Sequence, residues 1–237
     1  MKQRLDKILA SQGQLTRSQA GKLICGGSVR VNGKAVTDPA LKADPETDAI
    51  EADGKLITYR RNIYIMMNKP EDVVSVSESP GEKNVIDLLP PEMKRKGLFP
   101  AGRLDKNTTG FVLITDDGDF AHEILSPARH VEKTYIATLS RPIPEEQLKA
   151  FEDGVELSDG YKCLPAKITV LSGDGLTVEI VLKEGKYHQV RRMAAACGSH
   201  VDKLSRKKLG GLELDPGLSP GDCRLLTDDE LKMIGGQ

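Results

Sequence analysis

The sequence predicts an α+β protein of two domains, a small N-terminal module and a larger domain built on a mostly antiparallel mixed sheet. Two observations lead to this prediction. After residue 60, strand-like runs are interspersed with short helical patterns, which favours α+β over a purely parallel α/β arrangement. The polar stretch from Tyr59 to Asn62 follows an acidic segment and has the composition of a domain boundary. We therefore place the domains at residues 1–60 and 61–237.

The first sixty residues have the pattern of two short helices followed by a hairpin. Apolar residues spaced for one helix face begin at Leu5, and Gly13 ends this helix. The stretch from Thr16 to Gln19 is a capping-box pattern, and it starts a second helix that ends at Gly26. The Asn32-Gly33 pair lies between two alternating runs and is typical of a two-residue hairpin turn.

The larger domain shows five strand patterns and five helix patterns. The strands are expected at residues 63–67, 111–115, 133–139, 166–171 and 176–182. The helices are expected at residues 84–89, 121–125, 144–151 and 188–196, with a last short helix after the capping pattern at Thr227.

Composition excludes several classes of protein. Charged residues make up 29% of the 237 and hydrophobic residues 38%, which suits a globular chain. No stretch approaches the ~20 apolar residues of a membrane span, and no apolar signal segment follows the N-terminus. The four cysteines are scattered without a C-x-x-C pair, so we expect neither a metal site nor a disulfide framework. These features predict a cytoplasmic protein with reduced thiols.

The charge distribution says more than the net charge of −1. Residues 1–36 carry seven basic residues and one acid, and residues 183–208 carry eight basic residues and two acids. Residues 37–56 and 213–237 are acidic, with six acids and two basic residues each. Two basic zones separated by acidic ones fit an RNA that touches two surfaces, although ordinary surface charge explains each zone taken singly.

The stretch from Gly102 to Gly110 is the most informative motif. Asp105 lies between Arg103 and a Thr/Gly turn, and the apolar run Phe111 to Ile114 follows as a predicted buried strand. This order places Asp105 on a loop beside a rigid element, where working side chains are often held. Taken alone, the motif also fits a polar turn with a solvated carboxylate.

The pattern G-R-L-D-x-x-T-x-G at residues 102–110 resembles the catalytic motif of the pseudouridine synthases. With the stretch Met66 to Pro70 upstream, it is similar to the RsuA-type branch of that family. The resemblance implies that Asp105 is the catalytic carboxylate, acting either as a nucleophile on the sugar or by stabilising or deprotonating the sugar. The residues do not choose between these routes.

Two further stretches extend this resemblance. Lys133-Thr134-Tyr135 resembles the K-x-Y strand of the family, which implies that Tyr135 stacks on the flipped uracil and offers a phenol for proton transfer. The stretch from Glu184 to Met193 resembles a family motif at a helix start, which implies that Arg191 pairs with Asp105 and holds it ionised. His188 in the same stretch is expected to be a structural hydrogen-bonding residue at the helix N-terminus.

Three more positions match the family near the substrate. Arg103 matches a residue that helps displace the target base, and Leu204 and Arg206 match a stretch near the pocket wall. Ordered motifs between residues 66 and 210, together with the N-terminal module, extend the resemblance over nearly the whole chain. We therefore expect the pseudouridine synthase fold in the larger domain.

The N-terminal module resembles the S4 RNA-binding domain over roughly residues 1–58. The matches are Arg4 to Lys7, Thr16 to Ala20 with the apolar residues after it, and Gly27 to Gly33. The resemblance implies binding to structured RNA through backbone contacts. The basic residues expected to bind RNA are Arg4, Lys7, Arg17, Lys22, Arg30 and Lys34.

The resemblance implies a cofactor-free isomerase that converts a uridine of ribosomal RNA to pseudouridine. Among the enzymes of this branch, the pattern is most similar to the one that modifies uridine 516 of 16S rRNA, and a 23S rRNA enzyme is the alternative. The implied partner is ribosomal RNA, 16S rRNA within a small-subunit assembly intermediate. We expect a monomer that needs no metal or membrane.

Two rival functions come from other classes. The chain could be a non-enzymatic S4-type RNA-binding assembly factor, which the intact Asp105, Tyr135 and Arg191 set argues against. It could also be a hydrolase that cleaves a glycosidic bond with two carboxylates, for which the cluster Asp116 to Asp119 is the candidate second acid. A metal phosphatase built on these aspartates is less consistent with the sequence, because ligand spacing is absent.

Overall fold

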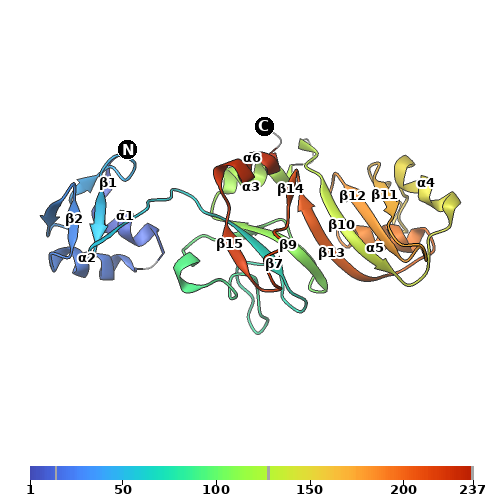
Figure 1. Ribbon diagram of the computed structural model, residues 1–237, viewed down its shortest axis with the longest axis horizontal. Coiled ribbons are helices and arrows are strands. Elements are labelled where there is room, and N and C mark those ends of the chain that lie inside the picture. Colours follow the sequence, from blue (N-terminus) through green and yellow to red (C-terminus); the bar gives the residue numbers. More distant parts are fainter. Residues whose placement is uncertain (14, 127–128, 236–237) are drawn as a thin grey trace. The chain divides into compact units, whose positions relative to one another are not determined.

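Two compact units make up the chain in the computed structural model (Figure 1). The structure describes residues 1–13, 15–126 and 129–235. The first unit consists of residues 1–63 together with 89–98, and the second consists of residues 64–88 and the chain from Phe99 onward. The segment 89–98 belongs to the first unit because Arg95 donates hydrogen bonds of 2.9 Å to the carbonyl oxygens of both Arg60 and Arg61.

The first unit is built from two short helices and small sheets. Its helices are α1 (Leu5–Ser11) and α2 (Arg17–Cys25). Its strands are β1 (Gln3–Arg4), β2 (Val29–Val31), β3 (Lys34–Val36), β4 (Lys42–Ala43), β5 (Ile50–Ala52) and β6 (Lys55–Leu56). The strands pair as β1-β4 and as β3-β2-β5-β6.

The local predictions for this unit are confirmed. Thr16 and Gln19 form the expected reciprocal capping box at the start of α2. Asn32 and Gly33 both have positive φ, as a two-residue hairpin turn between β2 and β3 requires. Leu5, Ile8 and Ile24 are fully buried, so the apolar helix faces form the core of the unit.

The second unit is built on a nine-stranded sheet. Its strands are β7 (Tyr64–Lys69), β8 (Phe99–Ala101), β9 (Thr108–Thr115), β10 (Lys133–Leu139), β11 (Lys167–Val170), β12 (Thr177–Leu182), β13 (Val201–Leu209), β14 (Leu212–Glu213) and β15 (Cys223–Leu225). The main path runs β11-β12-β10-β13-β9-β7-β15, with β8 on β9 and β14 on β13. Only β9 and β13 pair in parallel among these described strands, so the mostly antiparallel mixed sheet is confirmed.

Helices cover this sheet in two groups (Figure 1). They are α3 (Gly118–Leu125), α4 (Glu145–Asp153), α5 (Gln189–Ala196) and α6 (Asp228–Gly235). In Figure 1, α3 and α6 lie together near β14 and β15, whereas α4 packs against β11 and α5 against β13. Phe111 and Leu113 on β9 pack against Ile124 of α3 and Ile234 of α6 in one buried cluster. The continuous apolar run after Asp105 is thus a core strand, as predicted.

One expectation about secondary structure is wrong, and one long strand was not predicted. No helix forms at residues 84–89, because the side chain of Asn84 accepts hydrogen bonds from the backbone of Ile86 and Asp87 and so makes a turn. A single 3₁₀ turn, η1 (Pro91–Met93), follows. The strand β13 was not predicted, because irregularities in its register space the buried Val201, Leu204 and Leu209 unevenly and hide the period of two that marks a strand.

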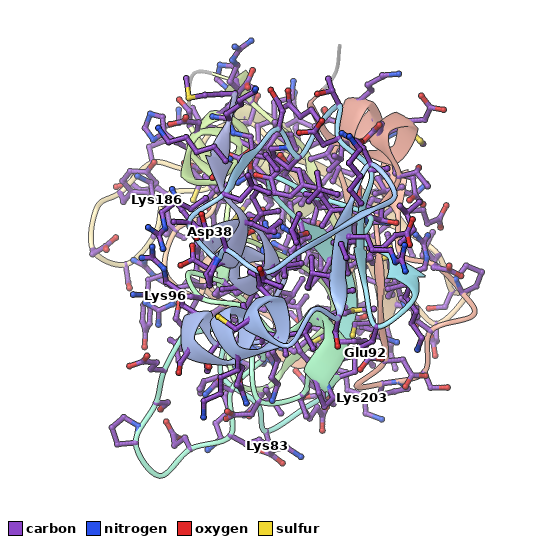
Figure 2. All side chains as sticks on the ribbon, turned by 90° about the vertical axis from the view of Figure 1, so that its left-hand side faces the viewer. Asp38, Lys83, Glu92, Lys96, Lys186 and Lys203 are labelled. Atoms are coloured by element: carbon purple, nitrogen blue, oxygen red, sulfur yellow. The ribbon has the colours of Figure 1, made fainter. Side chains whose placement is uncertain are left out.

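Charged side chains cover the surface. The six residues labelled in Figure 2 are all charged and exposed, and nitrogen and oxygen tips of the sticks project outward around the ribbon. Within the described ranges, no helix combines the length and apolar composition that crossing a bilayer requires.

Candidate active site

Asp105 lies on the loop just before β9, held by a buried lysine. Lys69, at the end of β7, is fully buried, and its Nζ donates to the carbonyl oxygens of Pro70 (2.9 Å), Lys106 (3.0 Å) and Thr108 (2.9 Å). Two of these carbonyls, of Lys106 and Thr108, follow Asp105 closely in the chain, so the ammonium group fixes the course of the loop. Burial lowers the pKa of Lys69 to about 8, and the Asp105 carboxylate opposes this shift.

A glycine lets the strand that follows Asp105 approach its parallel neighbour closely. Gly110 has a φ of 98°, and a Cβ at this position would overlap the backbone of Arg206. The register pairs Thr108 with Leu204 and Gly110 with Arg206. The close approach of β9 and β13 therefore brings Leu204 and Arg206 beside the Asp105 loop, although they are about a hundred residues away in sequence.

Strand pairing also places Tyr135 in the site. Tyr135 on β10 lies opposite Arg206 on β13, and Leu204 lies opposite Ala137. Directly opposed residues of an antiparallel pair share one face of the sheet. Tyr135, Leu204 and Arg206 therefore face the same side, where Tyr135 is only 9% exposed and Arg206 only 3%.

Two hollows meet at Asp105. A small one of about 70 Å³ is lined by Leu182, Val190 and Leu204. A larger one of about 830 Å³ extends past the small hollow and is lined by Lys133 and Arg206. Both hollows are also lined by Arg103, Asp105, Tyr135, Lys186 and His188. Asp105 and the Tyr135 ring thus lie where the small hollow adjoins the larger and more basic one.

His188 faces Asp105, contrary to our expectation of a structural residue at the helix start. Its Nε2 lies 3.6 Å from Asp105 Oδ1, and its side chain makes no hydrogen bond that caps α5. His188 has a φ of 49°, a conformation that is uncommon outside glycine. Its ring stacks on Tyr187 with centroids 3.8 Å apart.

The loop that carries His188 is fixed by a buried carboxylate. Glu184 accepts hydrogen bonds from Tyr161 Oη (2.8 Å), Leu164 N (2.9 Å) and Gln189 Nε2 (2.6 Å). Gln189 Oε1 in turn accepts a hydrogen bond from the backbone N–H of Lys186. This network orders residues 184–189, so that Lys186 and His188 line both hollows.

The expected ion pair between Arg191 and Asp105 is absent from the described residues. Arg191 donates instead to the carbonyl oxygens of Val201 (2.8 Å) and Asn107 (3.3 Å). Its guanidinium therefore reaches the loop two residues after Asp105 and supports the backbone there. The prediction was correct about the neighbourhood of Arg191 and wrong about the atom that it contacts.

The remaining predicted residues fall into two places. Arg103 is exposed and lines both hollows beside Asp105. The six basic residues predicted to bind RNA are all exposed on the first unit: Arg4, Lys7, Arg17, Lys22, Arg30 and Lys34. Arg4 and Arg17 also bind Asp6, at 2.8 Å and 3.2 Å, and these contacts lower the pKa of Asp6 to about 2.

Asp105 is the only carboxylate among the described residues that line the two hollows. The candidate second acid of a hydrolase is engaged elsewhere, since Asp117 caps α3 and accepts a hydrogen bond of 2.6 Å from Tyr64. No group of three or more His, Cys, Asp or Glu in the described part of the chain could hold a metal ion. The geometry therefore offers one carboxylate and an aromatic ring rather than an acid pair.

Sequence reasoning missed several residues that build this site. Lys69, Lys133 and Glu184 lie within the stretches that resemble the family, but the sequence analysis predicted no role for any of them. The available signal for Lys69 was its place two residues after the predicted strand at 63–67, because a lysine buried at a strand end must find acceptors for its ammonium group.

Comparisons with known proteins identify two families along the chain. The family described as RNA pseudouridylate synthase matches residues 63–196, and the S4 domain matches residues 3–48. A Bacillus subtilis protein named uncharacterized RNA pseudouridine synthase YtzG is 43% identical over 98% of this chain and 98% of its own length. The ribosomal small subunit pseudouridine synthase A of Escherichia coli K12 is 40% identical over 98% of this chain and 99% of its own length.

A solved structure supports the same conclusion. The crystal structure of a pseudouridylate synthase aligns with a TM-score of 0.67 at 38% identity, covering 98% of this chain and 99% of that one. The chain belongs to the RNA pseudouridylate synthase family. It carries an S4 domain at its N-terminal end, and the predicted resemblance to the RsuA-type enzymes is confirmed.

Proposed function

We propose that this enzyme converts one uridine of 16S rRNA, uridine 516, to pseudouridine. The observation that supports the chemistry is the position of Asp105 on the boundary of two hollows, beside the Tyr135 ring. The choice of RNA rests on the 40% identity, over nearly the full length of both chains, to a relative named for the ribosomal small subunit.

The reaction breaks the N1–C1′ bond of uridine, turns the uracil and makes a C5–C1′ bond. No atom is lost and nothing is oxidised, so no cofactor is needed. Asp105 either attacks C1′ or stabilises or deprotonates the sugar as the first bond breaks. The small hollow keeps the freed uracil in place, and the proton on C5 leaves after the new bond forms.

The neighbours of Asp105 have separate roles in this proposal. Tyr135 stacks on the uracil and its phenol accepts the C5 proton, while Leu204 forms the apolar wall. Arg103 fills the space that the flipped uridine leaves in the RNA. Arg191 positions the loop through Asn107 and adds positive charge near Asp105.

The first unit anchors the RNA in this proposal, with residues 1–60 as the S4 domain and 61–237 as the catalytic domain. Its exposed arginines and lysines neutralise phosphates, which supplies affinity without reading sequence. The substrate is then 16S rRNA within an assembling small subunit, and the enzyme acts in the cytoplasm as a monomer. A 23S rRNA target in the same branch is the alternative.

The experiment is tritium release from 5-tritiated uridine in 16S and 23S transcripts, each alone and with ribosomal proteins. Release from 16S, followed by mapping of the pseudouridine to position 516, is the expected result. Release from 23S alone would overturn the choice of RNA. Binding without release from either transcript would favour the non-catalytic assembly factor.

A further inference from the structure

Two cations are buried side by side in the second unit without a carboxylate partner. Lys133 is 7% exposed and Arg206 is 3% exposed. Lys133 donates through Nζ to the carbonyl oxygen of Val131 (2.8 Å), and no acid of the described residues lies within ion-pair distance of either cation. Buried charges are normally paired, so an uncompensated pair of like charges requires an explanation.

Arg206 is also short of hydrogen-bond partners. Its Nε donates to the carbonyl oxygen of Phe111 at 2.8 Å, but Nη2 is buried with no partner in the described structure. The guanidinium lies below Gly102, where a Cβ would come within 3.9 Å of Nη1. Arg206 therefore holds unused donors directly under the loop that carries Arg103 and Asp105.

The positive charges oppose each other. Burial lowers the pKa of Lys133 to about 8, and the charge of Arg206 lowers it further in the same direction. An anion placed between them would relieve this repulsion and accept the unused hydrogen bonds. The local electrostatics therefore favour a bound anion.

The position of these cations identifies the anion. Lys133 and Arg206 line the large hollow and not the small one, while Asp105 lines both. With the base in the small hollow and the sugar carbon at Asp105, the RNA backbone passes through the large hollow. The anionic group of that backbone is the phosphodiester.

We propose that Lys133 and Arg206 bind a phosphodiester next to the uridine whose base enters the small hollow. The inference rests on the proposed function and assigns the pair a substrate-binding task. Lys133 and Tyr135 lie two residues apart on β10 and so face the same side of the sheet. One strand thus supplies both the ring beside the base and a charge for the backbone.

The test uses short synthetic RNAs around the modified uridine, with either flanking phosphate replaced by a neutral methylphosphonate. Wild type, Lys133→Met, Arg206→Lys and the control Lys149→Met are compared in the full-length protein. Lys149 is an exposed residue of α4 and lines neither hollow. Melting temperatures are measured to show that each variant is folded.

We expect Lys133→Met to raise KM by about 10- to 100-fold with little change in kcat, as loss of a charge-assisted hydrogen bond predicts. The salt dependence of binding should fall by about one charge. One methylphosphonate should weaken binding to wild type and to Lys149→Met but have almost no further effect on Lys133→Met. Arg206→Lys keeps the positive charge but loses the paired N–H donors of the guanidinium group, so it should give an intermediate KM.

Equal methylphosphonate effects in wild type and Lys133→Met would overturn the inference while leaving the enzyme an active isomerase. A fall in kcat and melting temperature with unchanged KM would also overturn it, because the pair would then be purely structural. Absence of tritium release by wild type on every RNA would overturn both the inference and the proposed function.

Discussion

Asp105 is partly exposed, at 34% of its side chain, and shares its hollow with basic, polar and apolar side chains but with no second acid among the described residues. The imidazole Nε2 of His188 lies 3.6 Å from its Oδ1, which is longer than a hydrogen bond. His188 therefore lies against Asp105 without a hydrogen bond, whereas Lys69 and Arg191 act through the backbone of the loop.

We expect His188→Gln to lower kcat/KM by no more than about tenfold, because a partly exposed pair at this distance is worth about 1 kcal/mol. The exposed His200→Gln is the matched control and should leave kcat/KM unchanged. Single-turnover rates measure both variants. A loss as large as that of an Asp105 variant would show that His188 takes a direct part in the reaction.

Lys69→Met should destabilise the second unit by about 2 kcal/mol or more, because it removes a charged donor from three carbonyl oxygens, of which that of Lys106 keeps a bond from the backbone N–H of Asp72. Catalysis should fall further than stability predicts, since these bonds fix the loop that carries Asp105. Urea unfolding and kcat check the two effects. Lys83→Met, at an exposed position, is the control, and equal stability of the two variants would contradict this account.

At the scale of elements, the parallel contact between β9 and β13 builds the site. Gly110→Ala should cost at least about 2 kcal/mol, because the residue has positive φ and its Cβ would overlap the backbone of Arg206. Gly118→Ala, at the start of α3 with open space around it, should be neutral or slightly stabilising. Thermal unfolding compares the stability of the two variants. Similar losses of stability would contradict the claim that Gly110 is needed for the close approach of β9 and β13.

The start of α1 carries a pH-dependent contribution. The hydrogen bonds from Arg4 and Arg17 lower the pKa of Asp6 to about 2, below its value in an unfolded chain. This stabilisation is therefore complete above about pH 4 and is lost as the pH falls toward 2. Asp6→Asn should destabilise α1 at pH 6, and the difference from wild type should vanish near pH 2. Amide NMR signals of α1 in the full chain measure this, and a difference independent of pH would contradict it.

Local signals made some elements predictable. The capping box at Thr16 and the Asn32-Gly33 turn depend on neighbours a few residues away, and both are present. The strand β13 was missed because its inward positions are apparent only once its partners are known. The Arg191 contact was misjudged for a similar reason, since a motif fixes spacing along the chain but not the atom that a long side chain reaches.

At the scale of the whole molecule, both units carry basic zones. Lys7→Gln with Lys22→Gln, at exposed positions of α1 and α2, should weaken RNA binding and reduce its salt dependence by up to about two charges. kcat at saturating RNA should not change, because neither residue lines the hollows. Lys42→Gln with Lys55→Gln, in the acidic segment, is the control. Filter retention at several salt concentrations measures the binding. Equal RNA affinity of the two double variants would contradict a role of the first unit in RNA binding.

The most direct test of the account is tritium release from 5-tritiated uridine in 16S rRNA by wild type, Asp105→Asn and Asp119→Asn. Asp119 is an exposed carboxylate outside both hollows, so it controls for the loss of one negative charge. The account predicts release by wild type and Asp119→Asn, and none by Asp105→Asn even though it still binds the RNA. Release by Asp105→Asn at the wild-type rate would show that Asp105 is not the catalytic carboxylate.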